Sequence, residues 1–361
     1  MTVERAEAQA TEEFFTNRTG DAADHRRRLG PWSVSSIGWG TNSGELRNIV
    51  DLKVESALPE VITGGINFLD TSPAYRHRRS QAAIGRALPR LLSSGAVRRE
   101  QLVFASHVGF VALDRREEDA QEFFRRQVLP DSGLEDADFV AGAWSMHPRW
   151  IRAQLDLACR LLGLEHIDLL YLDAPEIALK QEGPERWKAL LMSAFAELES
   201  LVSEGRIGAW GIASLEGFTG NDTRRAPLQL PTLLEWARHA GGGSTGLCTI
   251  QAPFSLAQLD LLNPAGEGQP TLQETLSSTG LCFTGMLSLG QGQLCQDLPQ
   301  YLHPAMPGCR TDAQRALQFA RSTQGVTSAL VGMKTREHIQ ELCQLSALPA
   351  MPREDWLALF S

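Results

Sequence analysis

Three ionisable side chains stand where apolar segments of the chain end. They are Asp70, His107 and Asp173, and the apolar segments that lead to them span residues 66–69, 102–105 and 169–172. A phenol, Tyr75, follows Asp70 after a turn that contains Pro73, and this turn can return the hydroxyl to the end of the segment. Carboxylate, imidazole and phenol groups that share one place can pass protons to and from a substrate, so the set predicts a general acid–base site.

These side chains meet readily if the segments that carry them are parallel strands. Eight segments have the composition of short strands: residues 35–40, 66–71, 102–108, 167–173, 207–213, 247–253, 281–287 and 328–332. Helical patterns separate them, most clearly at residues 80–92, 150–162, 187–204, 232–240, 311–321 and 335–345. Strands that alternate with helices predict a parallel sheet. Eight such units favour an α/β fold of the (β/α)8 TIM barrel type, in which the carboxyl ends of all strands surround one mouth.

An open, doubly wound sheet is the alternative architecture. It normally carries a glycine-rich phosphate loop directly after its first strand. The corresponding residues here are Gly38, Trp39, Gly40 and Thr41, which lack the spacing of that loop. We therefore predict one barrel at residues 29–345. We also expect a polar N-terminal tail at 1–28, either flexible or draped on the barrel, and a C-terminal tail at 346–361.

One connection within the predicted barrel is unusually long. Residues 109–149 separate the third strand from the next helix, and they contain a charged helical piece at 115–128 and an acidic loop at 131–138. A segment that follows a barrel strand lies on the active-site face, and long loops there are usually lids or substrate walls. The other interpretation is that this segment is a solvent-exposed insertion without a role at the active site. Four aromatic residues near strand ends could form substrate walls or pack in the core: Trp39, Trp144, Phe218 and Phe254.

The composition is that of an ordinary globular protein. The chain has 361 residues, of which 43% are hydrophobic and 21% are charged. Its net charge of -9 and pI of about 5.5 argue against a nucleic-acid partner or an anionic membrane surface. The cysteines are scattered without a C-x-x-C pair, which favours buried thiols over disulfides or a zinc site. No apolar run reaches the length of a membrane span, so we expect a cytoplasmic protein; its oligomeric state stays open.

A resemblance to a known family covers most of the chain. The segment from Gly65 reads G-I-N-F-L-D-T-S-P-A-Y, and Ser80-Gln81 and Ile84-Gly85 follow it. This segment resembles the Asp/Tyr segment of the aldo-keto reductases, G-I-N-x-x-D-T-A-x-x-Y-x-x-x-x-S-E-x-x-I-G. Residues 154–168, 196–212 and 329–341 are similar to three further segments of the family. The resemblance implies a (β/α)8 barrel and an NAD(P)H-dependent oxidoreductase.

The resemblance also implies catalytic roles, because the family uses an Asp, a Tyr, a Lys and a His. Asp70 and Tyr75 match, whereas His107 stands at the Lys position and Asp173 at the His position. We expect Asp70 to raise the pKa of His107, so that the protonated imidazole acts on Tyr75. We expect Asp173 to stay protonated in a partly apolar mouth and to hold a substrate oxygen.

The cofactor implied by the resemblance is NADP. Gln251 matches the residue that holds the nicotinamide amide, Met286 stands where an aromatic ring usually stacks, and Lys334 could meet the 2′-phosphate as a point charge. The implied cofactor positions are Thr41, Ser214, Gln251, Met286, Leu289, Gly332, Met333, Lys334, His338 and Glu341.

The favoured function is an NADP-dependent reductase with altered proton chemistry that acts on a carbonyl or an enone of a small organic substrate. A non-redox acid–base enzyme on the same barrel, such as a dehydratase or an isomerase, is a second possibility, because the nicotinamide contacts are altered. A non-catalytic binding protein is the third possibility, and the presence of Tyr75 argues against it.

Overall fold

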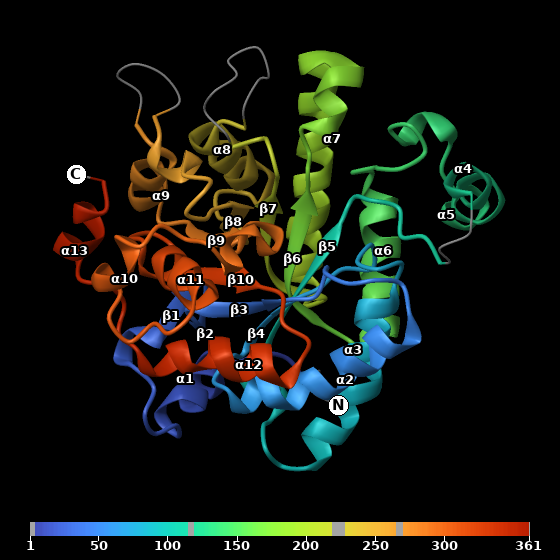
Figure 1. The fold of residues 1–361 in the computed structure, drawn as a ribbon. Helices are drawn as coiled ribbons and strands as arrows, with labels where there is room; N and C mark the ends of the chain where they lie inside the picture. Colours follow the sequence, from blue (N-terminus) through green and yellow to red (C-terminus); the bar gives the residue numbers. More distant parts are fainter. Residues whose placement is uncertain (1–3, 115–118, 219–227, 265–269, 361) are drawn as a thin grey trace.

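Eight parallel strands close into a barrel at the centre of the molecule (Figure 1). The computed structural model describes residues 4–114, 119–218, 228–264 and 270–360. The barrel strands follow the order of the chain, and the last strand, β10, pairs with the first, β3. They are β3 (Ile37–Gly40), β4 (Phe68–Asp70), β5 (Val103–Val108), β6 (Ile167–Asp173), β7 (Ile207–Ala213), β8 (Leu247–Pro253), β9 (Cys282–Met286) and β10 (Ser328–Val331). The predicted (β/α)8 barrel is confirmed, and all eight predicted strands are present.

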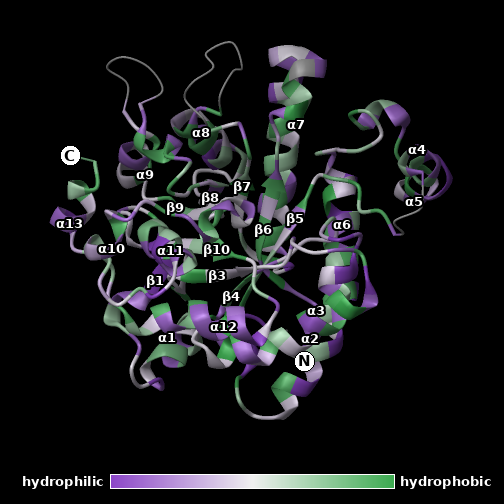
Figure 2. Ribbon diagram, in the orientation of Figure 1, coloured by the Kyte–Doolittle hydropathy of each residue, from purple (hydrophilic) through white to green (hydrophobic). Residues whose placement is uncertain are grey.

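Helices surround the barrel and carry both hydrophobic and hydrophilic residues, as expected for helices with one buried face (Figure 2). They are α2 (Asn48–Thr63), α3 (Arg79–Ser93), α6 (Pro148–Leu162), α7 (Ile177–Ser203), α8 (Leu230–Ala240), α9 (Leu272–Thr279), α11 (Asp312–Ser322) and α12 (Arg336–Cys343). Helix α7 begins earlier than predicted because a first helical piece precedes Gly183, whose φ of 75° interrupts the helix. Pro184 then begins the part that the sequence predicted. In the described ranges, none of the helices combines the length and the apolar character that a membrane span requires.

The described part of the predicted N-terminal tail folds against the amino-terminal end of the barrel. It contains helix α1 (Ala8–Thr16), and residues 26–35 form a hairpin of β1 (Arg26–Leu29) and β2 (Trp32–Ser35). The indole of Trp32 is buried and donates a hydrogen bond to the Ala6 carbonyl at 3.2 Å. The Ala6 amide donates in turn to the Asp168 carboxylate at the start of β6, at 2.7 Å. These contacts close one end of the barrel and leave the carboxyl ends of the strands for the site.

The remaining short helices lie outside the barrel wall. Helix α10 (Leu302–Ala305) precedes α11, and α13 (Arg353–Ala358) lies in the predicted C-terminal tail. The Trp356 ring of α13 stacks on Phe319 of α11 with ring centroids 5.7 Å apart. This stacking attaches the described end of the chain to the barrel.

The long connection after β5 forms a small unit beside α6 and α7. It contains α4 (Ala120–Phe123), a π-helix (Phe124–Val128) and α5 (Leu129–Ser132). Part of the predicted helical piece, residues 115–118, lies outside the described residues, as do residues 219–227 of the loop after β7. The aromatic rings of Phe124, Phe139 and Trp150 pack edge to face and give this unit its own core.

The four aromatic residues that could have lined a substrate pocket belong to the core. Trp39, Trp144, Phe218 and Phe254 are all buried. They pack in the large cluster of apolar side chains of the molecule. Their burial favours core packing, which was the other interpretation of these rings.

Candidate active site

The carboxyl ends of three neighbouring strands bring Asp70, His107 and Asp173 together, as the sequence predicted. Asp70 is the last residue of β4, His107 precedes the last residue of β5, and Asp173 ends β6. His107 Nε2 lies 3.0 Å from Asp70 Oδ2. On the other side of the ring, His107 Nδ1 lies 3.6 Å from Asp173 Oδ2, which is close enough for an ion pair but too long for a hydrogen bond. The imidazole therefore stands between two carboxylates.

The hydroxyl of Tyr75 reaches the same place from the loop after β4. It donates a hydrogen bond to Asp70 Oδ1 at 3.3 Å and lies 3.4 Å from His107 Nε2. Tyr75, Asp70 and His107 thus form one contact network at the mouth of the barrel. A proton can pass between the phenol and either neighbour without a large movement.

The two carboxylates determine the charge of His107. Burial alone would disfavour the protonated ring, but the negative charges of Asp70 and Asp173 outweigh it and raise the pKa of His107 to about 10. The ring is consequently a cation at neutral pH. It can supply a positive charge beside the Tyr75 hydroxyl.

The same surroundings favour the uncharged form of the Tyr75 phenol. Burial, together with the charges of Asp70 and Asp173, raises the pKa of Tyr75 well above its ordinary value of 10.0. Tyr75 is therefore a neutral hydroxyl that can donate a proton. The sequence predicted that His107 favours the ionised phenol, but the carboxylates oppose that effect in this structure. Asp173 was expected to hold a substrate oxygen, and in the structure its Oδ2 faces the His107 ring at 3.6 Å.

Two residues that the sequence did not assign to this network fix its geometry. The ring of Tyr171, on β6, stacks on the His107 ring with centroids 4.9 Å apart, and its hydroxyl bonds to Thr284 at 2.9 Å. Gln251, on β8, donates from Nε2 to Asp70 Oδ2 at 2.9 Å. Asp70 thereby receives contacts from Tyr75, His107 and Gln251. We expected Gln251 to hold the nicotinamide amide, and in the structure its Nε2 group donates a hydrogen bond to the Asp70 carboxylate.

Ser214 and Thr41 also lie at the mouth, where each bonds to protein groups. Thr41 follows β3 and donates to the Asp70 carbonyl at 3.2 Å. Ser214 follows β7, donates to Glu176 Oε1 and accepts from the Gly217 amide at 2.6 Å. The second oxygen of Glu176 is buried without a hydrogen-bond partner in the described part of the chain. Burial raises the pKa of Glu176, and no sequence signal distinguished this residue.

The loop after β9 is a glycine-rich turn with an unusual backbone. It follows Met286, the last residue of that strand, and contains Leu289. Gly290, Gln291 and Gly292 have consecutive φ angles of 54°, 57° and 95°. Within the loop, the Gly290 amide donates to the Leu287 carbonyl at 2.7 Å and the Gly292 amide donates to the Leu289 carbonyl at 2.9 Å. A side chain placed at Gly292 would meet nothing within 4 Å, so the loop also has space beside it. This open space fits a cofactor phosphate.

The segment after β10 contributes the remaining implied cofactor residues. Lys334 Nζ donates to Ser43 Oγ at 3.1 Å. A Cβ at Gly332 would lie 2.6 Å from the same Ser43 oxygen, so glycine permits the close approach of the two loops. Met333 is buried, and its carbonyl accepts from the Trp39 indole at 2.8 Å.

His338 and Glu341 lie farther along, on α12. The Glu341 carboxylate accepts from Thr311 Oγ1 at 2.5 Å. The backbone amide of His338 donates to Thr335 Oγ1 at 3.4 Å and contributes to the cap of the helix. These contacts tie the two residues to the start of α11 and of α12, away from the cluster around Asp70.

A parallel eight-stranded barrel with ionisable groups at its carboxyl-terminal mouth defines a TIM-barrel protein with a candidate catalytic centre. The family model "Aldo/keto reductase family" matches residues 36–221. The chain therefore belongs to the aldo/keto reductase family, a family of NAD(P)H-dependent oxidoreductases.

Individual relatives agree with this assignment. D-threo-aldose 1-dehydrogenase of a Pseudomonas species is 29% identical over 191 residues, which span 51% of this chain and 51% of that protein. L-galactose dehydrogenase of Arabidopsis thaliana is 22% identical over 85% of this chain and 83% of its own length. An aldo-keto reductase from Klebsiella pneumoniae, solved with NADPH, has the same fold, with a TM-score of 0.62 and 18% identity over 92% of this chain and 93% of its own.

Proposed function

We propose that this chain is an NADP(H)-dependent oxidoreductase that reduces a carbonyl or an enone of a small organic substrate. The observation that carries the proposal is the contact network of Tyr75, His107 and Asp70 at the mouth. It places a neutral phenol beside a cationic imidazole, and a buried carboxylate holds both. A proton donor of this kind is what carbonyl reduction needs in addition to a hydride.

Each residue of the network has a distinct part in the proposed reaction. Tyr75 donates the proton to the substrate oxygen, and Asp70 and the stacked Tyr171 ring fix the position of His107. The positive charge of His107 stabilises the phenolate that remains after the proton has left. Asp173 keeps His107 protonated and offers an oxygen to a substrate hydroxyl. Bound NADPH would supply the hydride.

The cofactor part of the proposal rests on three features of the chain. The glycine-rich loop after β9 has open space at Gly292, and Lys334 lies in the segment after β10 with its ammonium group beside Ser43. The orphaned oxygen of Glu176, beside Ser214, is a ready partner for an amide NH2 group. The Klebsiella pneumoniae neighbour of the same fold was solved with NADPH. These residues fit NADP(H) and give no reason to expect a different cofactor.

The charges at the mouth favour a neutral substrate. The carboxylates of Asp70 and Asp173 flank the single positive charge of His107. An anionic substrate would be repelled there. Both named relatives are dehydrogenases of sugars, and a polyhydroxylated aldehyde or its ring form is a neutral substrate of the appropriate size. We therefore place neutral sugars and small aldehydes first among candidate substrates.

The test begins with binding. Purified protein is titrated with NADPH and with NADH, and nicotinamide fluorescence is followed. Lys334→Ala should weaken NADPH by about 1 kcal/mol and NADH hardly at all, because a partly exposed charge contact has a modest energy. Ser43→Ala is the control, since it removes the neutral partner of Lys334 without removing the charge.

Turnover is then measured as loss of NADPH absorbance with neutral aldehydes, ketones and enones, and as gain with NADP and aldoses. Absence of NADPH binding at high micromolar concentration would refute the proposal and leave the non-redox acid–base enzyme as the better explanation of the site. Binding with turnover of an anionic substrate alone would refute the substrate class.

A further inference from the structure

The turn that carries Tyr75 has an unusual backbone. Arg76, His77 and Arg78, which follow the tyrosine directly, have φ angles of 52°, 52° and 68°. Side chains with a Cβ rarely adopt this left-handed conformation, and consecutive examples are rarer still. Helix α3 begins immediately afterwards at Arg79. Such a turn persists only where surrounding contacts hold it in place.

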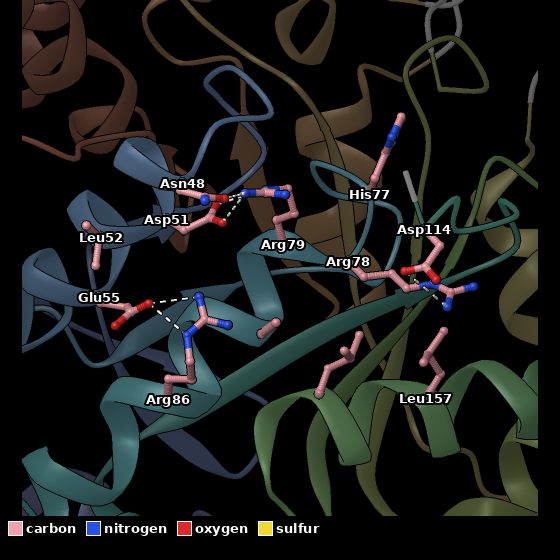
Figure 3. Close-up of a pocket in the computed structure, with 12 residues that line it drawn as sticks. Asn48, Asp51, Leu52, Glu55, His77, Arg78, Arg79, Arg86, Asp114 and Leu157 are labelled. Carbon is pink, nitrogen blue, oxygen red and sulfur yellow. Dashed lines mark hydrogen bonds and ion pairs between the residues drawn. The ribbon is translucent and has the colours of Figure 1, made fainter. Parts of the chain in front are cut away.

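One carboxylate holds both ends of this turn. Arg76 Nη2 lies 2.6 Å from Asp51 Oδ1, and the Arg76 side chain is only 1% exposed. Arg79 Nη2 lies 2.7 Å from the other oxygen, Asp51 Oδ2. Figure 3 shows Asp51 reaching from α2 toward Arg79, beside Asn48, at the edge of a groove of about 630 Å³. Asp51 therefore bridges the first residue after Tyr75 and the first residue of α3.

The same turn is attached to the loops on either side of the site. The Arg76 guanidinium donates to the Glu45 carbonyl at 2.8 and 3.2 Å, in the loop after β3. The Arg78 guanidinium donates to the Ala112 carbonyl at 2.8 and 3.0 Å, in the loop after β5 that begins two residues beyond His107. The position of the Tyr75 ring thus depends on contacts far from its hydroxyl.

From this arrangement we infer that Asp51 is a positioning residue for Tyr75: its ion pairs with Arg76 and Arg79 hold the left-handed turn that places the phenol against Asp70 and His107. The inference rests on the proposed role of Tyr75 as the proton donor. Asp51 itself touches none of these groups, so it acts through the backbone of the turn.

Helix α2 offers a matched control. Glu55 lies one helical turn after Asp51 and forms the equivalent ion pair with Arg86 of α3, at 2.8 Å. Both pairs join the same two helices, as Figure 3 shows, but Arg86 lies outside the turn. Asp51→Asn and Glu55→Gln therefore remove the same kind of bridge between the same helices. Only the first should affect Tyr75.

The decisive readout does not need a substrate. The chain has three tyrosines, Tyr75, Tyr171 and Tyr301, so the full chain labelled with 3-fluorotyrosine should give three fluorine resonances, which Tyr→Phe variants assign. In Asp51→Asn the Tyr75 resonance should shift or broaden and its phenol should titrate at lower pH, because the ring leaves the buried carboxylates. The resonance of the exposed Tyr301 should stay in place as the internal reference, and Glu55→Gln should leave all three resonances unchanged.

Turnover supplies an independent readout. Displacement of a reacting group by about 1 Å can lower kcat by about 10²-fold, so Asp51→Asn should reduce kcat strongly and leave the Kd for NADPH nearly unchanged. In a Tyr75→Phe background the same substitution should have no further effect on kcat. If Asp51→Asn does not fold, Arg79→Gln, which removes only the outer and partly exposed partner, takes its place in both experiments.

Two results would overturn the inference: a Tyr75 resonance that stays the same in Asp51→Asn, or one that changes equally in Glu55→Gln. Failure of NADPH to bind would refute the proposed function, whereas the fluorine spectrum would still decide whether Asp51 positions Tyr75. The two hypotheses can therefore fail separately.

Discussion

At the scale of single residues, the charge of His107 is the property most open to measurement. The pKa of about 10 in the folded protein exceeds the ordinary value of 6.5, so the folded state binds this proton more tightly than the unfolded state does. The resulting stabilisation is fully present below about pH 6.5 and is lost as the pH rises through about 10. Urea unfolding of the wild type and of His107→Gln should show a difference in unfolding free energy that shrinks between these limits. A constant difference would contradict the ion pairs described here.

Tyr75 and His107 should behave as one catalytic unit. Loss of a positioned proton donor lowers the rate by roughly 10²–10⁴-fold, and we expect Tyr75→Phe and His107→Ala each to reduce kcat within that range. The double variant should be no slower than the slower single variant, because both substitutions disable the same step. Additive losses would show that the two residues act independently, and an unchanged kcat in Tyr75→Phe would exclude the phenol as the proton donor.

The residues of the network were predictable to different degrees. Asp70, His107 and Asp173 stand at the ends of apolar runs, and this position alone predicts that they share a mouth. The contact of Gln251 with Asp70 joins residues 181 positions apart, and the stacking of Tyr171 on His107 depends on the register between two strands. Such contacts depend on three-dimensional pairing, for which a single sequence contains no pattern. For the same reason, the sequence could not predict that one carboxylate oxygen of Glu176 is buried without a hydrogen-bond partner in the described part of the chain.

At the scale of elements, the long connection after β5 is attached directly to the site. The Trp144 indole donates to the Asp173 carbonyl at 2.8 Å, and the Trp150 indole donates to the Gly109 carbonyl at 2.9 Å. Trp144→Phe should cost about 1–3 kcal/mol in unfolding free energy, because a buried carbonyl loses its donor. It should also lower the pKa of His107, measured by NMR titration, if Asp173 moves away from the ring.

Trp150→Phe is the control for this prediction, because it removes the same kind of hydrogen bond from the neighbouring element without touching Asp173. It should cost less stability, because the Gly109 carbonyl still accepts from the Ser145 amide at 3.0 Å, and it should leave the pKa of His107 in place. Equal effects of both variants on the titration would show that the connection acts on the whole mouth and not through Asp173.

Helix and strand prediction failed where periodicity was weak. Helix α2 has a proline inside it and exposes Ile49 and Leu52 in its first turns, so its apolar residues do not mark one clean face. The β1–β2 hairpin begins with three consecutive arginines, a sequence that indicates a solvated segment. Its Leu29 and Trp32 are nevertheless buried. The hairpin is stabilised by the barrel beneath it, which no local pattern describes.

At the scale of the whole molecule, Asp168 joins three parts of the chain at the closed end of the barrel. Its buried carboxylate accepts from the Ala6 amide at 2.7 Å, from the Phe104 amide at 2.8 Å and from Arg99 at 2.8 Å. Because the Arg99 side chain is buried as well, Asp168→Asn should cost about 3–5 kcal/mol in unfolding free energy.

The control for Asp168 is an ion pair on the surface of the molecule. Glu60→Gln removes the partner of Arg336, a largely exposed side chain, and should cost at most about 1 kcal/mol. Urea titrations of both variants provide the comparison. Similar losses in the two would mean that the N-terminal segment and β5 do not depend on the Asp168 carboxylate.

The closed end of the barrel also has a kinetic consequence. The β1–β2 hairpin covers the amino ends of the strands. Its Trp32 ring packs so close to Gly208 on β7 that a Cβ at Gly208 would lie 2.7 Å from the ring. Under the proposed function, nicotinamide and substrate therefore enter through the same carboxyl-terminal mouth of the barrel, and the one that lies deeper has to bind first and leave last. We expect steady-state measurements to show a compulsory order, with oxidised and reduced dinucleotide competing for the free enzyme while the organic product inhibits noncompetitively against NADPH.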